Sequence, residues 1–340
     1  MGRKTMIKTA LVVRRQLSPP ATCPRKHNMV RSGLLVLGVT YALSLAWGGA
    51  PPKAPVERKA QPVVNTLDDL RAAVVKLKPL QIPLGKPLRG DWLTEHKEPG
   101  QTFEQFVKRY PEPTSAGLST LYLQPIGDFG ATQQKLVDTT ARCLELFYGR
   151  PVKTLPTISL KEIPEDARRI NQQTQQTQIL STYVLDKVLK PHRPNDALAV
   201  LALCAEDLWP GKNWNYVFGQ ASLSERVGVW SIQRFGDPDE SRAAYQLCLE
   251  RTLGTALHET GHMLGIPHCT ADKCGMNGSN SLPESDRTPL HFCAECQPKV
   301  WWTCNLTAKK HLEELIKFAQ THELTASEDH WQKSLDALKR

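Results

Sequence analysis

Three histidines and a glutamate gather in the run HETGHMLGIPHC, which extends from His258 to Cys269. His258 and His262 are four residues apart, so on a helix both imidazoles project from one face and can bind one metal ion. Gly265 then lets the chain turn sharply, and the turn brings His268 toward the same ion. Three neutral nitrogen ligands with a fourth position open to water are typical of catalytic zinc.

Glu259 directly follows the first of these ligands. A carboxylate in this place can take the proton of an attacking water and pass it to a leaving amine. The short HExxH pattern also occurs by chance on exposed helices. The extended spacing HExxHxxGxxH, which requires Gly265 and His268 as well, is far more specific. We therefore expect a catalytic zinc site with Glu259 as its general base.

Four cysteines follow the histidines in two pairs. Cys269 and Cys274 flank four residues, and Cys293 and Cys296 form a CxxC farther along. Two such pairs are the ligand set of a closed structural zinc site, which would fasten the loop after the active-site helix to the loop before the last helix. Disulfides are the alternative, and export to an oxidising compartment would favour them. The CxxC spacing suits one metal better than a strained bridge, so we expect two zinc ions per chain.

The other cysteines give weaker signals. Cys143, Cys204 and Cys248 lie within apolar periodic segments. We expect them in the core, and Cys304 has no assigned role.

Strand and helix patterns alternate upstream of the histidines and then the strand patterns cluster. Strands are expected in 119–127, 152–160, 215–223 and 227–235, an apolar run in 196–208, and helices in 132–149 and 176–190. This order predicts an α+β protein with an α/β-like mixed sheet, helices packed on the sheet, and an antiparallel strand at one edge.

A longer helix is expected to carry the histidine motif. Asp239, Glu240 and Ser241 supply a helix start with favourable N-terminal charge. The helix should end at Gly265, because glycine adopts the left-handed conformation of a C-terminal cap most readily.

The whole run HETGHMLGIPHCTADKCGMNGSN, followed by CAEC, resembles the signature of the archaemetzincins, also called archaelysins, in the metzincin clan of zinc metallopeptidases. The resemblance extends to LYLQPIGDF, NYVFGQASL, VGVWSIQRF and DRTPL, and covers roughly Thr102 to Leu324. It implies a metzincin-like zinc-peptidase domain with an active-site helix and a Met-turn. It also implies that Met276 packs beneath the three imidazoles.

The resemblance has two further consequences. The stretch NYVFGQASL would be the edge strand that borders the cleft, where an extended peptide can add by backbone hydrogen bonds; a strand that only completes the sheet fits the sequence equally well. No tyrosine occurs after Tyr245. The tyrosine that some metzincins place behind the Met-turn therefore has no counterpart, and zinc must stabilise most of the oxyanion.

The positive charge of the chain is concentrated at its start. The formal net charge is +9, and residues 1–50 hold eight basic residues and no acidic one, which leaves +1 for the remainder. A near-neutral body argues against a nucleic-acid partner.

The domain prediction follows from this composition. Residues 1–50 are expected to be a signal peptide or membrane anchor with a basic n-region, and residues 51–117 a Pro- and Lys-rich tether and N-terminal extension. Residues 118–325 would be the catalytic domain with its structural zinc site, and residues 326–340 a C-terminal tail.

Together these features favour a zinc metallopeptidase that hydrolyses peptide or protein substrates. The alternative is a non-catalytic, zinc-stabilised binding module. Glu259 separates the two hypotheses, because a purely structural metal site needs no acidic residue there and usually fills all four positions of its metal.

We predict that the protein is exported, to a periplasm or by secretion, and that the mature chain begins near Trp47. A basic stretch precedes the apolar run from Gly33, and Ser44, Leu45 and Ala46 offer a cleavage site at its end. An uncleaved run would instead anchor the chain and bring it into contact with a membrane. The intact mass of protein recovered outside the cytoplasm tests the prediction; full-length cytoplasmic protein would contradict it.

Overall fold

A six-stranded mixed sheet organises the part of the chain that the computed structural model describes, which comprises residues 12–13, 64–114, 117–212, 214–222 and 225–340. The predicted signal peptide or anchor lies outside these residues, apart from the two residues of β1. None of the helices in the described part is both long enough and apolar enough to cross a membrane.

The strand order confirms a mixed sheet with an antiparallel strand beside its parallel ones. Strands β2, β3, β6 and β9 are parallel, β8 is antiparallel to β9, and β1 pairs in parallel with the outer edge of β8. In spatial order the strands are β1 Val12–Val13, β8 Gly219–Ser222, β9 Val227–Ser231, β6 Ala197–Cys204, β2 Thr120–Ile126 and β3 Val152–Thr154.

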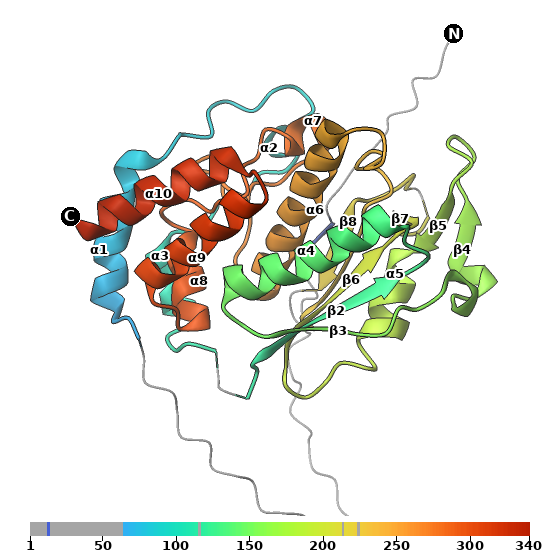
Figure 1. Ribbon diagram of the computed structural model, residues 1–340, viewed down its shortest axis with the longest axis horizontal. Helices are drawn as coiled ribbons and strands as arrows, with labels where there is room; N and C mark the ends of the chain where they lie inside the picture. The colour runs from blue at the N-terminus through green and yellow to red at the C-terminus, as the bar shows by residue number, and fades with distance from the viewer. Residues whose placement is uncertain (1–11, 14–63, 115–116, 213, 223–224) are drawn as a thin grey trace, which may run out of the picture. The chain divides into compact units, whose positions relative to one another are not determined.

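Helices cover both faces of this sheet (Figure 1). Helices α4 (Ala131–Tyr148) and α6 (Arg242–Met263) pack on one face, and α5 (Ser181–Tyr183), which continues as a π-helix over Val184–Leu189, packs on the other. Leu121 of β2 faces the core beneath α4 and α6, whereas the neighbouring Tyr122 belongs to the core beneath the π-helix. This alternation is why strands buried on both faces read as continuous apolar runs.

A second, three-stranded sheet corrects the prediction of a helix over 176–190. Its strands, in spatial order, are β4 Arg168–Ile170, β5 Thr177–Leu180 and β7 Asp207–Trp209. The first part of the predicted helix is therefore a strand, and only the residues from Ser181 onward are helical. Ile179 is fully buried and pairs with β4 on one side and β7 on the other. Tertiary pairing here overrides the local pattern.

The remaining helices flank the end of the sheet domain. They are α1 Leu67–Leu77, α2 Trp92–Glu95, α3 Phe103–Arg109, α7 Leu282–Ser285, α8 Gln297–Cys304, α9 Ala308–Thr321 and α10 Thr325–Lys339, with 3-10 turns at Lys78–Leu80, Leu160–Glu162 and Glu165–Ala167.

The described part of the predicted tether and N-terminal extension, residues 64–114, contains helices α1, α2 and α3. A capping box between Thr66 and Asp69 starts α1, which then buries Leu70 and packs against α8 and α10. Helix α3 buries Phe106 completely. The region is rich in Pro and Lys, yet the apolar faces of α1 and α3 belong to the main core.

The predicted C-terminal tail, 326–340, lies almost wholly in α10. Trp331, Leu335 and Leu338 are spaced four and three residues apart, which places them on one face of the helix, and that face is buried. Helix α10 packs against α9 and α1. Of the single cysteines, Cys143, Cys204 and Cys248 are buried as predicted, and Cys304 is buried too.

Replacement of the Trp331 side chain should show that α10 is part of the core. We expect Trp331→Ala to lower the free energy of unfolding by about 3–5 kcal/mol, because it removes a large, fully buried side chain. Lys333→Ala on the exposed face of the same helix is the matched control and should change it by less than about 1 kcal/mol. Urea denaturation measures both variants. Equal stability of the two would mean that α10 is dispensable.

Candidate active site

Helix α6 and the turn after it form as the sequence predicts. The Ser241 side chain accepts a hydrogen bond from the Ala244 N–H at 3.1 Å and caps the helix start. The helix ends at Met263, and Gly265 has a φ of +85°. A Cβ atom at Gly265 would lie only 2.5 Å from the Tyr110 hydroxyl oxygen. Conformation and close approach both require glycine at this turn.

The three predicted histidines come together at the end of α6. His258, His262 and His268 offer ligand atoms that all lie within 4.8 Å of one another, and all three side chains are buried. Each Nδ1 has an oxygen partner at 2.8 Å: the Gly275 carbonyl, the Ile266 carbonyl and the Glu98 carboxylate, respectively. Each Nε2 is buried without a hydrogen-bond partner. These unpartnered nitrogens are the donor set that a zinc ion requires.

Burial keeps the imidazoles of His258 and His262 neutral. It lowers the pKa of His258 to about 3, with a further contribution from His268, and it lowers the pKa of His262 well below its usual value. Neutral imidazole is the form that binds a metal ion. The site is therefore ready to accept a cation at neutral pH without first losing protons from these two rings.

Glu259 directly follows the first histidine on α6, and its carboxylate lies against β8. Its side chain is fully buried, and neither carboxylate oxygen has a hydrogen-bond partner. Burial raises the pKa of Glu259 to about 8. A Cβ atom on Gly219, the first residue of β8, would lie 3.1 Å from Glu259 Oε1, which is tighter than an ordinary contact, so glycine at this position lets the carboxylate lie close against the strand. A neighbouring cation would favour the charged carboxylate and offset this shift.

The four predicted cysteines form a second cluster. Cys269, Cys274, Cys293 and Cys296 are buried, free of disulfides, and offer sulfur atoms within 4.8 Å of one another. The Cys269 and Cys293 sulfurs are 3.7 Å apart. Tetrahedral zinc with Zn–S bonds of about 2.3 Å separates its sulfurs by about 3.8 Å, whereas a disulfide bond is about 2.05 Å long. The spacing suits four ligands of one metal ion.

Hydrogen-bond donors around the cysteine cluster also favour metal binding. The backbone N–H groups of Met276 and Cys293 both donate to the Cys274 sulfur, at 3.4 and 3.2 Å. Lys299 is almost completely buried, and its ammonium lies 3.9 Å from the Cys296 sulfur. These donors stabilise thiolates, the form of cysteine that binds metal.

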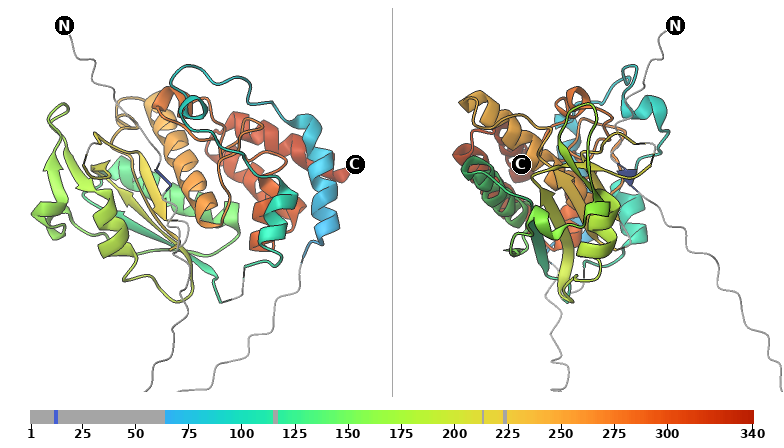
Figure 2. Two further views of the ribbon diagram at one scale, coloured as in Figure 1. Left: turned by 180° about the vertical axis from the view of Figure 1, so that it is seen from behind. Right: turned by 90° about the vertical axis from the view of Figure 1, so that its right-hand side faces the viewer.

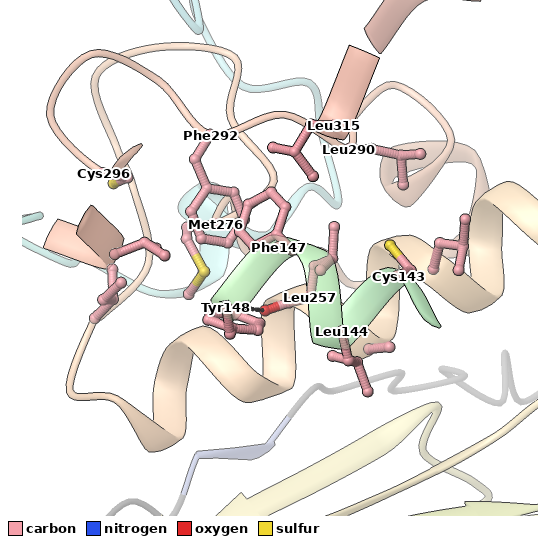
Figure 3. Packing of buried hydrophobic residues seen from close by; sticks show 14 of the residues in the cluster. Cys143, Leu144, Phe147, Tyr148, Leu257, Met276, Leu290, Phe292, Cys296 and Leu315 are labelled. Atoms are coloured by element: carbon pink, nitrogen blue, oxygen red, sulfur yellow. Dashed lines mark hydrogen bonds between the residues drawn. The ribbon is translucent and has the colours of Figure 1, made fainter. Parts of the chain in front are cut away.

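Met276 lies directly behind the helix that carries the histidines. A Cβ atom on Gly261 would approach the Met276 sulfur to 2.5 Å, so glycine at this helical position makes room for the side chain. Figure 3 shows Met276 among Phe292, Phe147 and Tyr148, and the rings of Phe147 and Phe292 meet edge to face at 4.9 Å. The methionine thus packs into the main core on the side of α6 away from the sheet strands.

Two contributors to the site carry no signal in the sequence. Glu98 accepts from the His268 ring, and Trp92 places its ring 5.0 Å from the same imidazole in an edge-on arrangement. Burial alone would raise the pKa of Glu98, but the hydrogen bond with His268 outweighs it together with smaller contributions, so the pKa falls. Both residues come from a region that sequence composition favoured as a tether, and neither has a motif spacing that links it to His268.

A cavity of about 380 Å³ lies next to the first histidine. Residues of α6 from Glu250 to His258, the segment from Lys273 to His291 and the start of α10 form its walls.

The comparison with protein families matches residues 146–301 to Peptidase family M54. The matched residues include all three histidines, Glu259 and the four cysteines, and the protein is a zinc metallopeptidase.

Known relatives identify the family. The chain is 32% identical to archaemetzincin-2 of Mus musculus over 268 residues, which are 69% of this chain and 74% of the relative. It is 32% identical to archaemetzincin-2 of Homo sapiens over 259 residues, which are 67% and 71% of the two chains. Among solved structures, the chain is similar to the crystal structure of archaemetzincin from Methanopyrus kandleri, with 28% sequence identity and a TM-score of 0.44. The match covers 58% of this chain and 97% of the archaemetzincin chain. The chain belongs to the archaemetzincin family.

The turn after α6 gives a test of local strain. Gly265→Ala should lower the free energy of unfolding by about 1–3 kcal/mol, because alanine is disfavoured at positive φ and its methyl group meets Tyr110. Gly254→Ala within α6 is the matched control, since its Cβ would make only an ordinary contact, 3.4 Å from Leu290. The control should be neutral or stabilising by up to about 1 kcal/mol. Guanidinium denaturation compares the two, and an undiminished stability of Gly265→Ala would refute the requirement for glycine.

Proposed function

We propose that the protein hydrolyses peptide bonds at the histidine cluster, with His258, His262 and His268 holding zinc. The observation that carries the proposal is the convergence of three buried, unpartnered Nε2 atoms, two of them from a helix that also carries the buried, unpartnered Glu259 carboxylate. A bound zinc ion would supply Lewis acidity toward the attacking water and the peptide carbonyl.

The protein's own groups divide the remaining work. Glu259 is the general base: it removes the proton of the attacking water and delivers it to the amine as the peptide bond breaks. Its lack of other hydrogen-bond partners leaves both carboxylate oxygens available for these transfers. Helix α6 is the active-site helix and Met276 belongs to the Met-turn, where the thioether supports the helix between Glu259 and His262 through contact with Gly261.

Substrate binding is proposed to use the sheet edge and the adjoining cavity. Strand β8 is antiparallel to β9, and its first residue, Gly219, lies against Glu259. The outer edge of β8 pairs with β1, so an extended peptide would take the place of β1 there. It would then pass the general base and can place one side chain in the cavity beside His258. Digestion of a peptide library, with sequencing of the products, would report the side chains that this cavity selects.

We also propose that the four cysteines hold a second, structural zinc ion. The thiolate spacing and the N–H donors to Cys274 support this role. Export through the N-terminal segment is a further proposal, supported by the basic and apolar pattern of the first fifty residues alone.

The base is tested by Glu259→Gln. Glutamine keeps the size of the side chain and removes its basicity, so zinc content should be unchanged while peptide hydrolysis falls by about 10²–10⁴-fold. His262→Ala should lose both activity and the zinc of the histidine cluster, because only two ligands remain. Metal analysis and initial rates on one peptide measure both variants. If Glu259→Gln cleaves as fast as the unmodified protein, the mechanism fails; if neither form cleaves any peptide while zinc stays bound, a zinc-stabilised binding module is the better description.

The second metal ion is tested by Cys293→Ser. We expect two zinc ions per unmodified chain and one in the variant, together with a lower thermal midpoint, because the binding free energy of a structural zinc contributes to folding. Elemental analysis counts the metal. A single zinc in the unmodified protein, with the four cysteines paired as disulfides on non-reducing peptide mapping, would refute the structural site.

A further inference from the structure

The segment from Gln81 to Tyr110, which we call the strap, runs along both metal-ligand clusters. Its first residues join the loop between Cys269 and Cys274 by backbone hydrogen bonds: Leu84 N–H donates to the Ala271 carbonyl at 2.9 Å, and Lys273 N–H donates to the Ile82 carbonyl at 2.8 Å. Figure 2 shows this part of the chain, coloured cyan to teal, beside the orange loops that follow α6.

The later part of the strap is fixed to the second cysteine pair. The Phe103 N–H donates to the carboxylate of Glu295 at 2.6 Å. Glu295 lies between Cys293 and Cys296 in the sequence. The buried Lys299 ammonium donates to the Gln101 carbonyl at 2.5 Å. The strap is therefore held on both sides of the stretch that contains Glu98.

Glu98 is the part of the strap that reaches the histidine cluster. Its Oε2 lies 2.8 Å from His268 Nδ1, and the two residues are 170 positions apart in the sequence. His268 is the only ion-pair partner of Glu98 within 4.0 Å among the residues that the structure describes. No lysine or arginine of that part competes for the carboxylate.

This contact differs in kind from those of the other two imidazoles. His258 and His262 donate to backbone carbonyls, which are neutral and belong to the same segment of chain as the ligands. His268 alone is matched with an ionisable side chain, and that side chain comes from outside the region matched by the M54 family. A carboxylate partner orients the ring and increases the basicity of the nitrogen that faces the metal.

We propose that Glu98 is a positioning residue for the catalytic centre: through His268 Nδ1 it fixes the ring of the third ligand and strengthens its bond to zinc. The proposal rests on the proposed function in so far as His268 holds zinc. Glu98 itself touches neither the substrate nor the ion.

The test is the zinc affinity of the histidine cluster in full-length Glu98→Gln, Glu98→Ala and Glu98→Asp. Competition with a zinc chelator measures the affinity, and His262→Ala, which leaves only the cysteine cluster intact, identifies the signal of that second site. We expect affinity at the histidine cluster to fall about 10–100-fold in Glu98→Ala. The fall should be smaller in Glu98→Gln, which keeps a neutral acceptor, and Glu98→Asp should recover part of the loss. Affinity at the cysteine cluster should not change.

Asp91→Asn is the matched control. Asp91 is another strap carboxylate, paired with Arg287 at 2.7 Å, and it has no contact with a histidine of the cluster. The Asp91→Asn substitution should leave the zinc affinities of both clusters unchanged. Unfolding of the metal-free variants should show whether a substitution only destabilises the packing of the strap. Unaltered affinity in Glu98→Ala, or an equal loss in Asp91→Asn, would overturn the proposal. Because the readout is metal binding, failure of the unmodified protein to cleave peptides would count against the proposed function without deciding the role of Glu98.

Discussion

The hydrogen bonds at Nδ1 of the three histidines are the constraint on which the site depends. A neutral imidazole has one N–H and one lone pair, so a ring whose Nδ1 donates to an oxygen must present the lone pair at Nε2. The three acceptors are the carbonyls of Gly275 and Ile266 and the carboxylate of Glu98. Each acceptor belongs to a different local structure: the loop over residues 269–296 that carries the four cysteines, here called the cysteine loop, the turn after α6 and the strap. The shared space between the Nε2 atoms therefore exists only when all three local structures are in place.

The cysteine loop has little regular structure of its own to hold Gly275. Between Gly265 and Cys296 the only helix is α7, and the described strands contribute nothing there. A few backbone contacts, such as Cys269 N–H to the Met276 carbonyl at 2.8 Å and Gly275 N–H to the His291 carbonyl at 2.8 Å, tie the loop together. Four sulfur ligands on one ion would add the rigidity that such a loop lacks. The second cluster would thus act on the first through the position of the Gly275 carbonyl group and through Cys269, which directly follows His268.

The sequence predicts the parts of this arrangement that depend on local spacing. His258, His262 and Gly265 are placed by helix geometry and by a left-handed turn, and the alternating apolar runs place most strands of the sheet. Interactions between distant segments are beyond such patterns. The contact between Glu98 and His268 joins residues with no common motif, and β5 is a strand because two neighbours pair with it, although its local pattern suggests a helix. The spacing of the apolar residues in α10 predicts an amphipathic helix, but the polar composition of residues 326–340 suggested a tail.

Helix α8 couples segments outside the M54 match to the metal clusters, in addition to the direct contacts that the strap makes. Helix α8 begins directly after Cys296, and two helices pack against it: α1, which precedes the strap, and α3, which lies near the end of the strap. Helix α10 also packs against α1, so the C-terminal end of the chain supports the same anchor. A shift of α8 would move the last cysteine ligand and both ends of the strap together. The strap carries Glu98, the acceptor of His268. The contacts among α1, α3, α8 and α10 that bury apolar surface therefore also fix the geometry of the histidine cluster.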